Sequence, residues 1–249
     1  MGGGIGMYVP CNNCRLRRTA YFRSFTGQEL GWVAALKSAH IEVTPKTDIV
    51  LAGEVGGALY TLYHGWAFRY ELLPGGGRQI FDLLLPGDLI GLASVVLGTI
   101  RHSVQTLTPS SFCVLQGYSF ADLFKRDSGF AFEFLRLRLE EEMRADRKLA
   151  LLGRHTPIER LGFLMLETFD RLHARELANG RSCPFPLRRQ HLADATGLSM
   201  IHLNRTLGEL RAEKLAYIEE KILVIEDRER LSTLSGYEPI FPSARRLLV

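Results

Sequence analysis

The sequence predicts an α+β protein in which an antiparallel β jelly roll is followed by one long helix and a C-terminal domain of short helices. Three observations lead to this prediction. Short apolar runs separated by turn residues fill the stretch 41–118, a helical pattern replaces them at about Ser128, and two short helices joined by a tight turn are indicated over 187–207. Because strand patterns and helix patterns occupy separate stretches, we expect separate domains rather than alternating β and α units.

The first half of the chain has the pattern of short strands. Apolar runs lie at 58–63, 66–70 and 79–84, and turn residues separate them, most clearly Pro74-Gly75-Gly76-Gly77 and Pro86-Gly87-Asp88. Such closely spaced turns are typical of an antiparallel barrel or jelly roll. No long helix fits between these strands.

A long helix is predicted from about Ser128 to Leu152. Its first half is unusually apolar, with Phe130, Phe134, Leu135, Leu137 and Leu139. This exceeds what one side of a lone surface helix requires, so we expect a second copy of the chain to pair around Phe134 and Leu137. Charged residues interrupt a strict heptad seam at Glu141, Arg144 and Lys148.

A new domain is predicted to begin at Thr156-Pro157-Ile158-Glu159, where Thr156 can cap a helix and Glu159 can complete a capping box. The helix that follows has one apolar face and ends before a predicted loop over 178–186. The predicted divisions are an N-terminal extension at 1–40, a β-barrel sensor domain at 41–118, a dimerisation helix at 119–153, a C-terminal domain at 154–235 and a tail at 236–249.

The stretch 187–207 predicts a helix-turn-helix. Small Ala193 allows the two helices to approach, Gly197 can adopt positive φ at the turn, and Ser199 can cap the second helix. A shared core is expected from Leu192, Leu198, Leu203 and Leu207. Two strands around a polar turn are predicted over 217–225 and would form a wing.

The start of the second helix is predicted to read DNA in the major groove. Its solvent-facing residues are Met200, Ile201, His202, Asn204 and Arg205. Arg205 can donate two hydrogen bonds to guanine O6 and N7, while Asn204 and His202 can reach base edges or phosphates. The alternative is an ordinary helical hairpin with Arg205 as a solvated charge, and the predicted wing argues against it.

From about Cys11 to Asp227 the chain resembles the Crp/Fnr family of transcription regulators. Leu85-Pro86-Gly87-Asp88-Leu89-Ile90-Gly91 resembles the turn that leads into the family's sensor pocket, and 187–207 resembles its helix-turn-helix. The resemblance implies a cyclic-nucleotide-binding-like barrel, a winged helix-turn-helix, and a homodimer that binds double-stranded DNA at an inverted-repeat operator, with RNA polymerase as a further partner.

The resemblance also assigns roles to individual residues. Arg189 and Gln190 match positions that touch phosphate, and Arg205 matches the base-reading arginine. Ser199 and Met200, at the start of the second predicted helix, are also expected to bind DNA. Ile201 stands where the catabolite activators and the oxygen-responsive members have an acidic residue, so we do not assume the usual half-site.

Cyclic AMP is a disfavoured effector. Where cyclic-AMP-binding members place a ribose-binding glutamate and a phosphate-binding Arg-Ser pair, this chain has Leu92 and His102-Ser103. The lost carboxylate leaves the ribose hydroxyls unpaired, and neutral His102 is a poor substitute for a guanidinium.

Cys11, Cys14 and Cys113 resemble three of the four thiolates that hold an iron-sulfur cluster in oxygen-sensing members of the family. The fourth position holds Ala20, which cannot bind iron. Three interpretations remain open: a cluster whose fourth ligand is a carboxylate, a histidine or a small molecule; a redox dithiol at Cys11 and Cys14; or a buried Cys113 beside a CxxC without a ligand. Cys183 is interpreted as structural.

The composition and motifs argue against other classes. The net charge of +4 permits a polyanionic partner without identifying one, and no apolar run is long enough for a membrane helix. The N-terminus lacks the apolar segment of a secretory signal, so we expect a cytoplasmic protein. No catalytic constellation is found, so we expect no enzyme. The alternative function is a cyclic-nucleotide-like ligand-binding module that acts through protein contacts.

Overall fold

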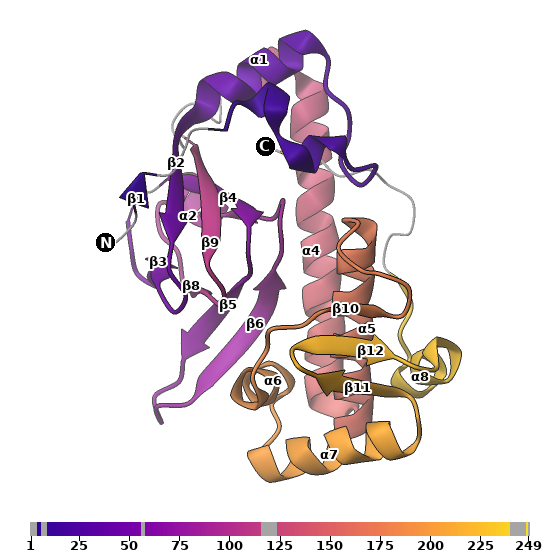
Figure 1. Cartoon of the computed structure of the whole chain (residues 1–249). Helices are drawn as coiled ribbons and strands as arrows, with labels where there is room; N and C mark the ends of the chain where they lie inside the picture. The colour runs from indigo at the N-terminus through magenta and orange to yellow at the C-terminus, as the bar shows by residue number, and fades with distance from the viewer. Residues whose placement is uncertain (1–3, 6–8, 56–57, 116–123, 240–247, 249) are drawn as a thin grey trace. The chain divides into compact units, whose positions relative to one another are not determined.

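The computed structural model describes residues 4–5, 9–55, 58–115, 124–239 and 248 (Figure 1). The chain divides into two compact units. One unit contains 1–71, 82–138 and 245–249, and the other contains 72–81 and 139–244. We call them the sensor unit and the reader unit after the roles that the sequence predicts for their main parts.

The sensor unit is built on two antiparallel sheets, as the sequence predicts. Their orders are β1-β2-β9-β4-β7 and β3-β8-β5-β6. The strands are β1 Gly4–Ile5, β2 Lys37–Val43, β3 Asp48–Val50, β4 Leu59–His64, β5 Ala67–Leu72, β6 Arg78–Leu84, β7 Leu89–Ile90, β8 Ser103–Thr106 and β9 Ser110–Leu115. All three predicted apolar runs are strands, namely β4, β5 and β6.

A core of buried apolar side chains belongs to these sheets and includes Leu62, Ala67, Val104 and Phe112. The predicted turn at 86–88 requires its glycine, because Gly87 has a φ of 94° and an added Cβ would collide with the ring of Phe22.

Among the described residues, short helical segments accompany the strands: η1 Cys11–Asn13, η2 Arg15–Arg18, α1 Gly27–Leu36 and α2 Leu92–Leu97. The sequence interpretation of 1–40 missed α1. Its start is a capping box, in which the Thr26 hydroxyl accepts the Glu29 amide at 3.2 Å and the Thr26 amide donates to the Glu29 carboxylate at 2.7 Å.

The long helix is α4, Ser128–Arg154, close to its predicted bounds. The expected pairing residues are wrong, however. Phe134 and Leu137 are only 6% and 9% exposed because they pack in their own chain with Val33, Leu36 and Phe130. The apolar side chains that α4 exposes are instead Phe132, Leu135, Leu139, Met143 and Leu149.

The reader unit contains α5 Pro157–Ala174, β10 Ser182–Pro184, α6 Arg189–Thr196, α7 Met200–Ala212, β11 Ala216–Glu219, β12 Ile222–Ile225 and α8 Arg228–Ser235 (Figure 1). The predicted start of α5 is confirmed, with Thr156 and Glu159 forming the capping box. The predicted loop over 178–186 is partly wrong, because β10 pairs with β12 and extends the wing to three strands. The sequence interpretation also missed α8. In the part of the chain that the structure describes, no helix is long and apolar enough to cross a membrane.

Candidate nucleic-acid interface and thiol cavity

The turn between α6 and α7 forms as the sequence predicts. Gly197 ends α6 with a φ of 67°, and a Cβ there would lie 3.2 Å from Leu152 Cδ2. The Ser199 hydroxyl accepts the backbone amide of His202 at 3.3 Å and thereby caps α7. Leu192 and Leu203 are fully buried in the unit, while Leu198 and Leu207 are half-buried.

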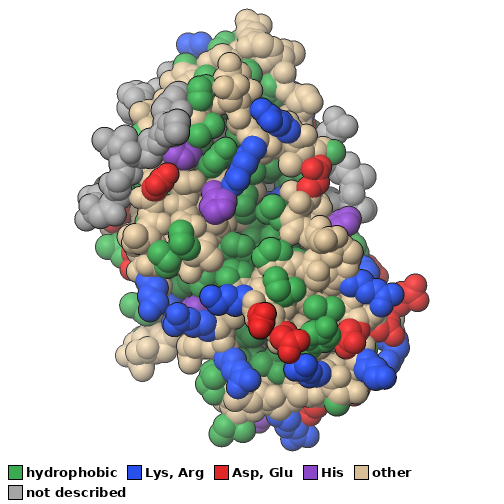
Figure 2. All heavy atoms as spheres, in the orientation of Figure 1, with side chains coloured by type: hydrophobic (Ala, Val, Ile, Leu, Met, Phe, Trp, Pro, Cys, Tyr) green, Lys and Arg blue, Asp and Glu red, His purple; other side chains and the backbone are tan. Residues whose placement is uncertain are grey.

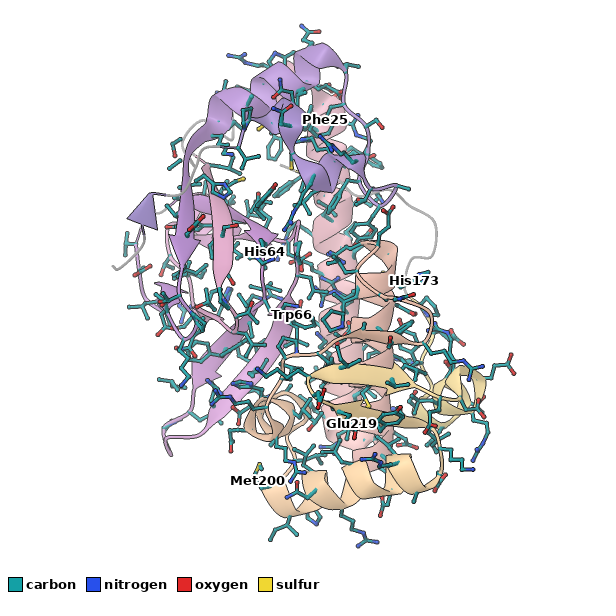
Figure 3. All side chains as sticks on the ribbon, in the orientation of Figure 1. Phe25, His64, Trp66, His173, Met200 and Glu219 are labelled. Carbon is teal, nitrogen blue, oxygen red and sulfur yellow. The ribbon has the colours of Figure 1, made fainter. Side chains whose placement is uncertain are left out.

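The first two turns of α7 present the predicted recognition surface to solvent. The exposed side chains are Met200, Ile201, His202, Asn204 and Arg205; Figure 3 labels Met200 at the start of the helix. Ile201 is 80% exposed, a large value for an apolar residue. An exposed apolar side chain beside polar donors suits a surface that contacts thymine methyl groups and base edges.

Arg205 projects from this surface and pairs within its own helix. Its side chain is 78% exposed, and its Nε donates to Glu209 Oε1 at 2.8 Å. An exposed ion pair of this kind contributes little free energy, about 0–1 kcal/mol. Arg205 can therefore exchange the Glu209 carboxylate for guanine at small cost.

The predicted phosphate-contacting residues, Arg189 and Gln190, lie exposed in the first turn of α6. Figure 2 shows Lys and Arg side chains over the lower part of the visible face, mixed with Asp and Glu. Positive charge is therefore not concentrated over this part of the visible face.

Asp194 of α6 makes several side-chain and backbone hydrogen bonds within the reader unit. It is 8% exposed, and one of its carboxylate oxygens accepts Arg78 Nε at 2.8 Å and Arg78 Nη2 at 2.7 Å. The other oxygen accepts Gln190 Nε2 at 2.7 Å, and the backbone carbonyl accepts Gln79 Nε2 at 2.8 Å. The hairpin segment 72–81 is thus anchored to the helix that precedes the reading helix.

His191 is a neutral acceptor at the start of α6. Its Nδ1 accepts the Arg188 backbone N–H at 3.1 Å. The pKa of His191 is lowered to about 4, mainly by burial and also by Arg78 and Arg188, against the opposing effect of Asp194. Protonation of the imidazole would abolish this hydrogen bond, because a protonated Nδ1 cannot accept the Arg188 N–H.

Folding of the reader unit is therefore expected to weaken in acid. The pKa of His191 is lower in the folded chain than in the unfolded chain, so between about pH 6.5 and about pH 4 the unfolded state binds more protons. The stabilisation is complete above about pH 6.5 and is lost as pH falls through this window. Denaturant unfolding should show a shallower fall for His191→Asn, which keeps an acceptor, and wild-type behaviour for His173→Asn at an exposed site. Identical pH curves for His191→Asn and wild type would contradict this.

The sensor unit brings the three predicted cysteines to one cavity. Cys11 comes from η1, Cys14 follows it, and Cys113 comes from β9. The lining residues are Val9, Cys11, Cys14, Leu16, Arg17, Val33, Lys37, Thr61, Tyr63, Cys113, Leu115 and Leu248, a set called the thiol cavity below. Within the described residues, no three His, Cys, Asp or Glu side chains are arranged to hold a metal ion.

Burial raises the pKa of two of these thiols, Cys11 and Cys113, against the effect of nearby cations. Burial raises the pKa of Cys11, opposed by Arg17 and Lys37. Burial likewise raises the pKa of Cys113, opposed by the charge of Lys37 and its hydrogen bond. Cys113 Sγ also lies 3.8 Å from His40 Nδ1. Cys183 is buried in β10, where burial raises its pKa to about 12, which agrees with a structural role.

His102, one of the residues that replace the cyclic-AMP ligands, has a strongly lowered pKa. The pKa of His102 is lowered to about 4, mainly by burial and also by the charges of Arg69 and Arg138. His102 is therefore neutral at pH 7 and cannot replace a guanidinium facing a phosphate.

The fold and the recognition surface define a two-part regulator, with a sensor domain and a DNA-binding domain. The comparisons with known proteins agree. A cyclic nucleotide-binding domain matches residues 40–127, and a Crp-like helix-turn-helix domain matches 159–234. The chain belongs to the Crp/Fnr family of DNA-binding transcription regulators.

Several relatives span most of the chain. The transcriptional activatory protein AadR of Rhodopseudomonas palustris is 28% identical, over 79% of this chain and 81% of that protein. The transcriptional activator FnrL of Cereibacter sphaeroides is 24% identical, over 91% and 92%. The solved structure of FixK2 from Bradyrhizobium japonicum has the same fold, with a TM-score of 0.72 and 24% identity over 81% of this chain and 98% of that one. AadR and FnrL are named as transcriptional activators, in agreement with the expectation that the chain is not an enzyme.

Proposed function

We propose that this regulator acts as a homodimer that reads an inverted-repeat operator through α7 and senses its signal at the thiol cavity. One observation supports the DNA-reading role most strongly. Five exposed side chains, among them Asn204 and the 78% exposed Arg205, occupy the start of a helix whose cap and preceding turn are both formed. Helices of this kind enter the major groove with their N-terminal residues at the base edges.

In this proposal, residues of α7 read the bases and residues of α6 position the protein on the DNA backbone. Arg205 contacts a guanine, Asn204 and His202 contact neighbouring base edges, and Met200 and Ile201 supply apolar contacts. Arg189 and Gln190 hold phosphate and fix the register of α6. The names of AadR and FnrL describe activators, which supports RNA polymerase as a partner of this chain.

Selection of bound fragments from a random pool of duplex DNA tests this function. The full chain should enrich an inverted repeat that contains at least one fixed guanine in each half-site. A module that acts only through protein contacts would enrich no sequence, and that result would overturn the proposal.

For the sensor, we propose that Cys11, Cys14 and Cys113 hold an oxygen-sensitive iron-sulfur cluster. Thiolates are the soft donors that such clusters require, and all three line one cavity. Ala20 supplies no fourth ligand, so a small molecule or another side chain completes the set. When bound, the cluster would supply a redox-active group that oxygen can degrade. The protein contributes the three thiolates, apolar walls that limit water, and two nearby cations.

Protein purified without oxygen should then show thiolate-to-iron absorbance in the visible range. Each of Cys11→Ser, Cys14→Ser and Cys113→Ser should lower the absorbance and the bound iron and sulfide, because serine is a poor ligand for a soft metal. Cys183→Ser is the matched control and should change nothing. Colourless anaerobic protein without iron or sulfide, whose DNA binding is unaffected in the triple variant, would eliminate the cluster.

A further inference from the structure

His202, near the start of α7, has one ring nitrogen held within its own helix. Its Nδ1 lies 3.1 Å from the Ser199 hydroxyl oxygen, and the same oxygen accepts the His202 backbone amide at 3.3 Å. The imidazole is exposed, and its other nitrogen, Nε2, has no hydrogen-bond partner among the described residues. His202 therefore offers Nε2 to the DNA, and what it reads depends on whether that nitrogen carries a hydrogen.

The Ser199 hydroxyl favours the tautomer with hydrogen on Nε2. A serine hydroxyl both accepts and donates, and this one already accepts a backbone amide, so its own hydrogen is available to Nδ1. The backbone amides at a helix N-terminus also carry partial positive charge, which favours a lone pair on a ring nitrogen beside them. With Nδ1 as the acceptor, the hydrogen of the neutral ring lies on Nε2.

A second histidine in the same helix-turn-helix has the same arrangement. His191 is the third residue of α6, and His202 is the third residue of α7. The Nδ1 of His191 accepts the Arg188 backbone N–H at 3.1 Å, which places the hydrogen of its neutral ring on Nε2. Both imidazoles thus turn Nδ1 toward the start of their helix, and His202 does so on the recognition surface.

We propose that His202 is a specificity-determining residue, which donates a hydrogen bond from Nε2 to an acceptor on a base edge while Ser199 fixes its tautomer. Guanine, adenine and thymine present such acceptors in the major groove, at N7, O6 or O4, whereas cytosine presents the N4 donor. His202 therefore selects against cytosine. A protonated ring keeps this polarity, because both nitrogens of an imidazolium are donors.

The base read by His202 is expected beside the guanine read by Arg205. The two residues are three positions apart and so share one face of α7. This inference rests on the proposed DNA-reading role of α7 and adds the polarity of one contacted base edge. It is independent of any ligand in the thiol cavity.

Long-range hydrogen–nitrogen NMR correlation spectra of the free, labelled full chain test the tautomer. The ring signals that disappear in His202→Phe identify His202, and spectra at a pH where the ring is neutral show which nitrogen carries the hydrogen. Wild type should have the hydrogen on Nε2. A hydrogen on Nδ1 would overturn the proposal, because Nε2 would then accept rather than donate.

Competition binding with each of the four bases at every position of the selected half-site tests the readout. Wild type should bind about fivefold more weakly when cytosine replaces the preferred base beside the Arg205 guanine, the effect of about one hydrogen bond. His202→Phe keeps an aromatic ring but no donor, so it should lose this discrimination and keep the preference for guanine. His173→Phe, at an exposed site on α5, is the matched control and should keep the wild-type profile. Circular dichroism should confirm that each variant is folded.

Changes to the hydroxyl and to the DNA separate this contact from a general effect of the helix cap. Ser199→Thr keeps a capping hydroxyl and should retain more of the discrimination than Ser199→Gly, which caps nearly as well but has no hydroxyl. In operators with a 7-deazapurine or 4-thiothymine at this position, the acceptor is removed or weakened while base pairing is kept. Such operators should bind wild type more weakly than the unmodified operator does and should bind His202→Phe unchanged.

A wild-type base profile in His202→Phe, or a preference for cytosine that depends on His202, would overturn the proposal. If the full chain enriches no sequence, the DNA-reading function itself fails, and the inference fails with it. If Arg205 still reads a guanine but His202 has no effect at the neighbouring base, only the inference fails.

Discussion

Arg205→Ala is expected to weaken specific DNA binding by about 1–3 kcal/mol and to blur the preference at one guanine. The Arg205 side chain is 78% exposed near the start of α7 and forms a surface ion pair with Glu209. Its loss therefore removes a base contact and leaves the helix pair intact. Fluorescence anisotropy on the selected operator, and on operators substituted at each position, measures both effects.

Arg189→Ala is the matched control, because it removes an exposed arginine from the same pair of helices. It should weaken binding to all sequences alike and lower the salt dependence, as expected of a phosphate contact. Equal, sequence-independent losses for the two variants would contradict the assignment of Arg205 as the base reader.

Charged substitutions among the exposed apolar side chains of α4 are expected to disrupt the dimer. Phe132, Leu135, Leu139 and Met143 follow one another at spacings of three and four residues, so they share one face of the helix. Phe132→Glu or Leu135→Glu would place a charge in this face and should convert dimers to monomers. DNA affinity should then fall about 10²–10⁴-fold, because two linked half-site contacts become one.

The apolar changes Phe132→Leu and Leu135→Met at the same positions should preserve the dimer. Light scattering at micromolar concentration measures the assembly. Wild-type protein that is monomeric yet binds an inverted repeat tightly, or glutamate variants that remain dimers, would rule out α4 as the dimer helix.

The sequence alone predicts the elements whose turns and caps are specified by residues nearby in the chain. Gly197 and Ser199 specify the turn and cap of the reading helices through backbone conformation and a nearby hydroxyl, and Thr156 with Glu159 does the same for α5. The turns between the strands depend equally on nearby glycines and prolines. Such signals lie within a few residues of the feature that they determine.

Features that depend on tertiary packing could not be predicted from the sequence. Phe132 and Phe134 are both apolar residues of α4, and only the packing of Phe134 against α1 decides which of them remains exposed. Helix α1 was missed because its sequence is apolar nearly all round and contains Gly27 and Gly31, although the Thr26–Glu29 capping box was a usable signal.

In the candidate sites, too, nearby residues could be predicted from the sequence, whereas contacts between distant residues could not. Cys11, Cys14 and Cys113 were predicted as a group, but no local pattern indicates that Arg17 and Lys37 line the same cavity. The contact of Arg78 with Asp194 joins residues separated by 116 positions, and no local pattern links them.

Hydroxyl-radical footprinting of the selected operator tests the central claim most directly. Two chains, each reading a half-site through α7, should protect two patches related by two-fold symmetry, with centres about one helical turn apart. Arg205→Ala should lose this protection at protein concentrations where wild type retains it. A single asymmetric patch, or uniform protection that does not depend on Arg205, would contradict the account.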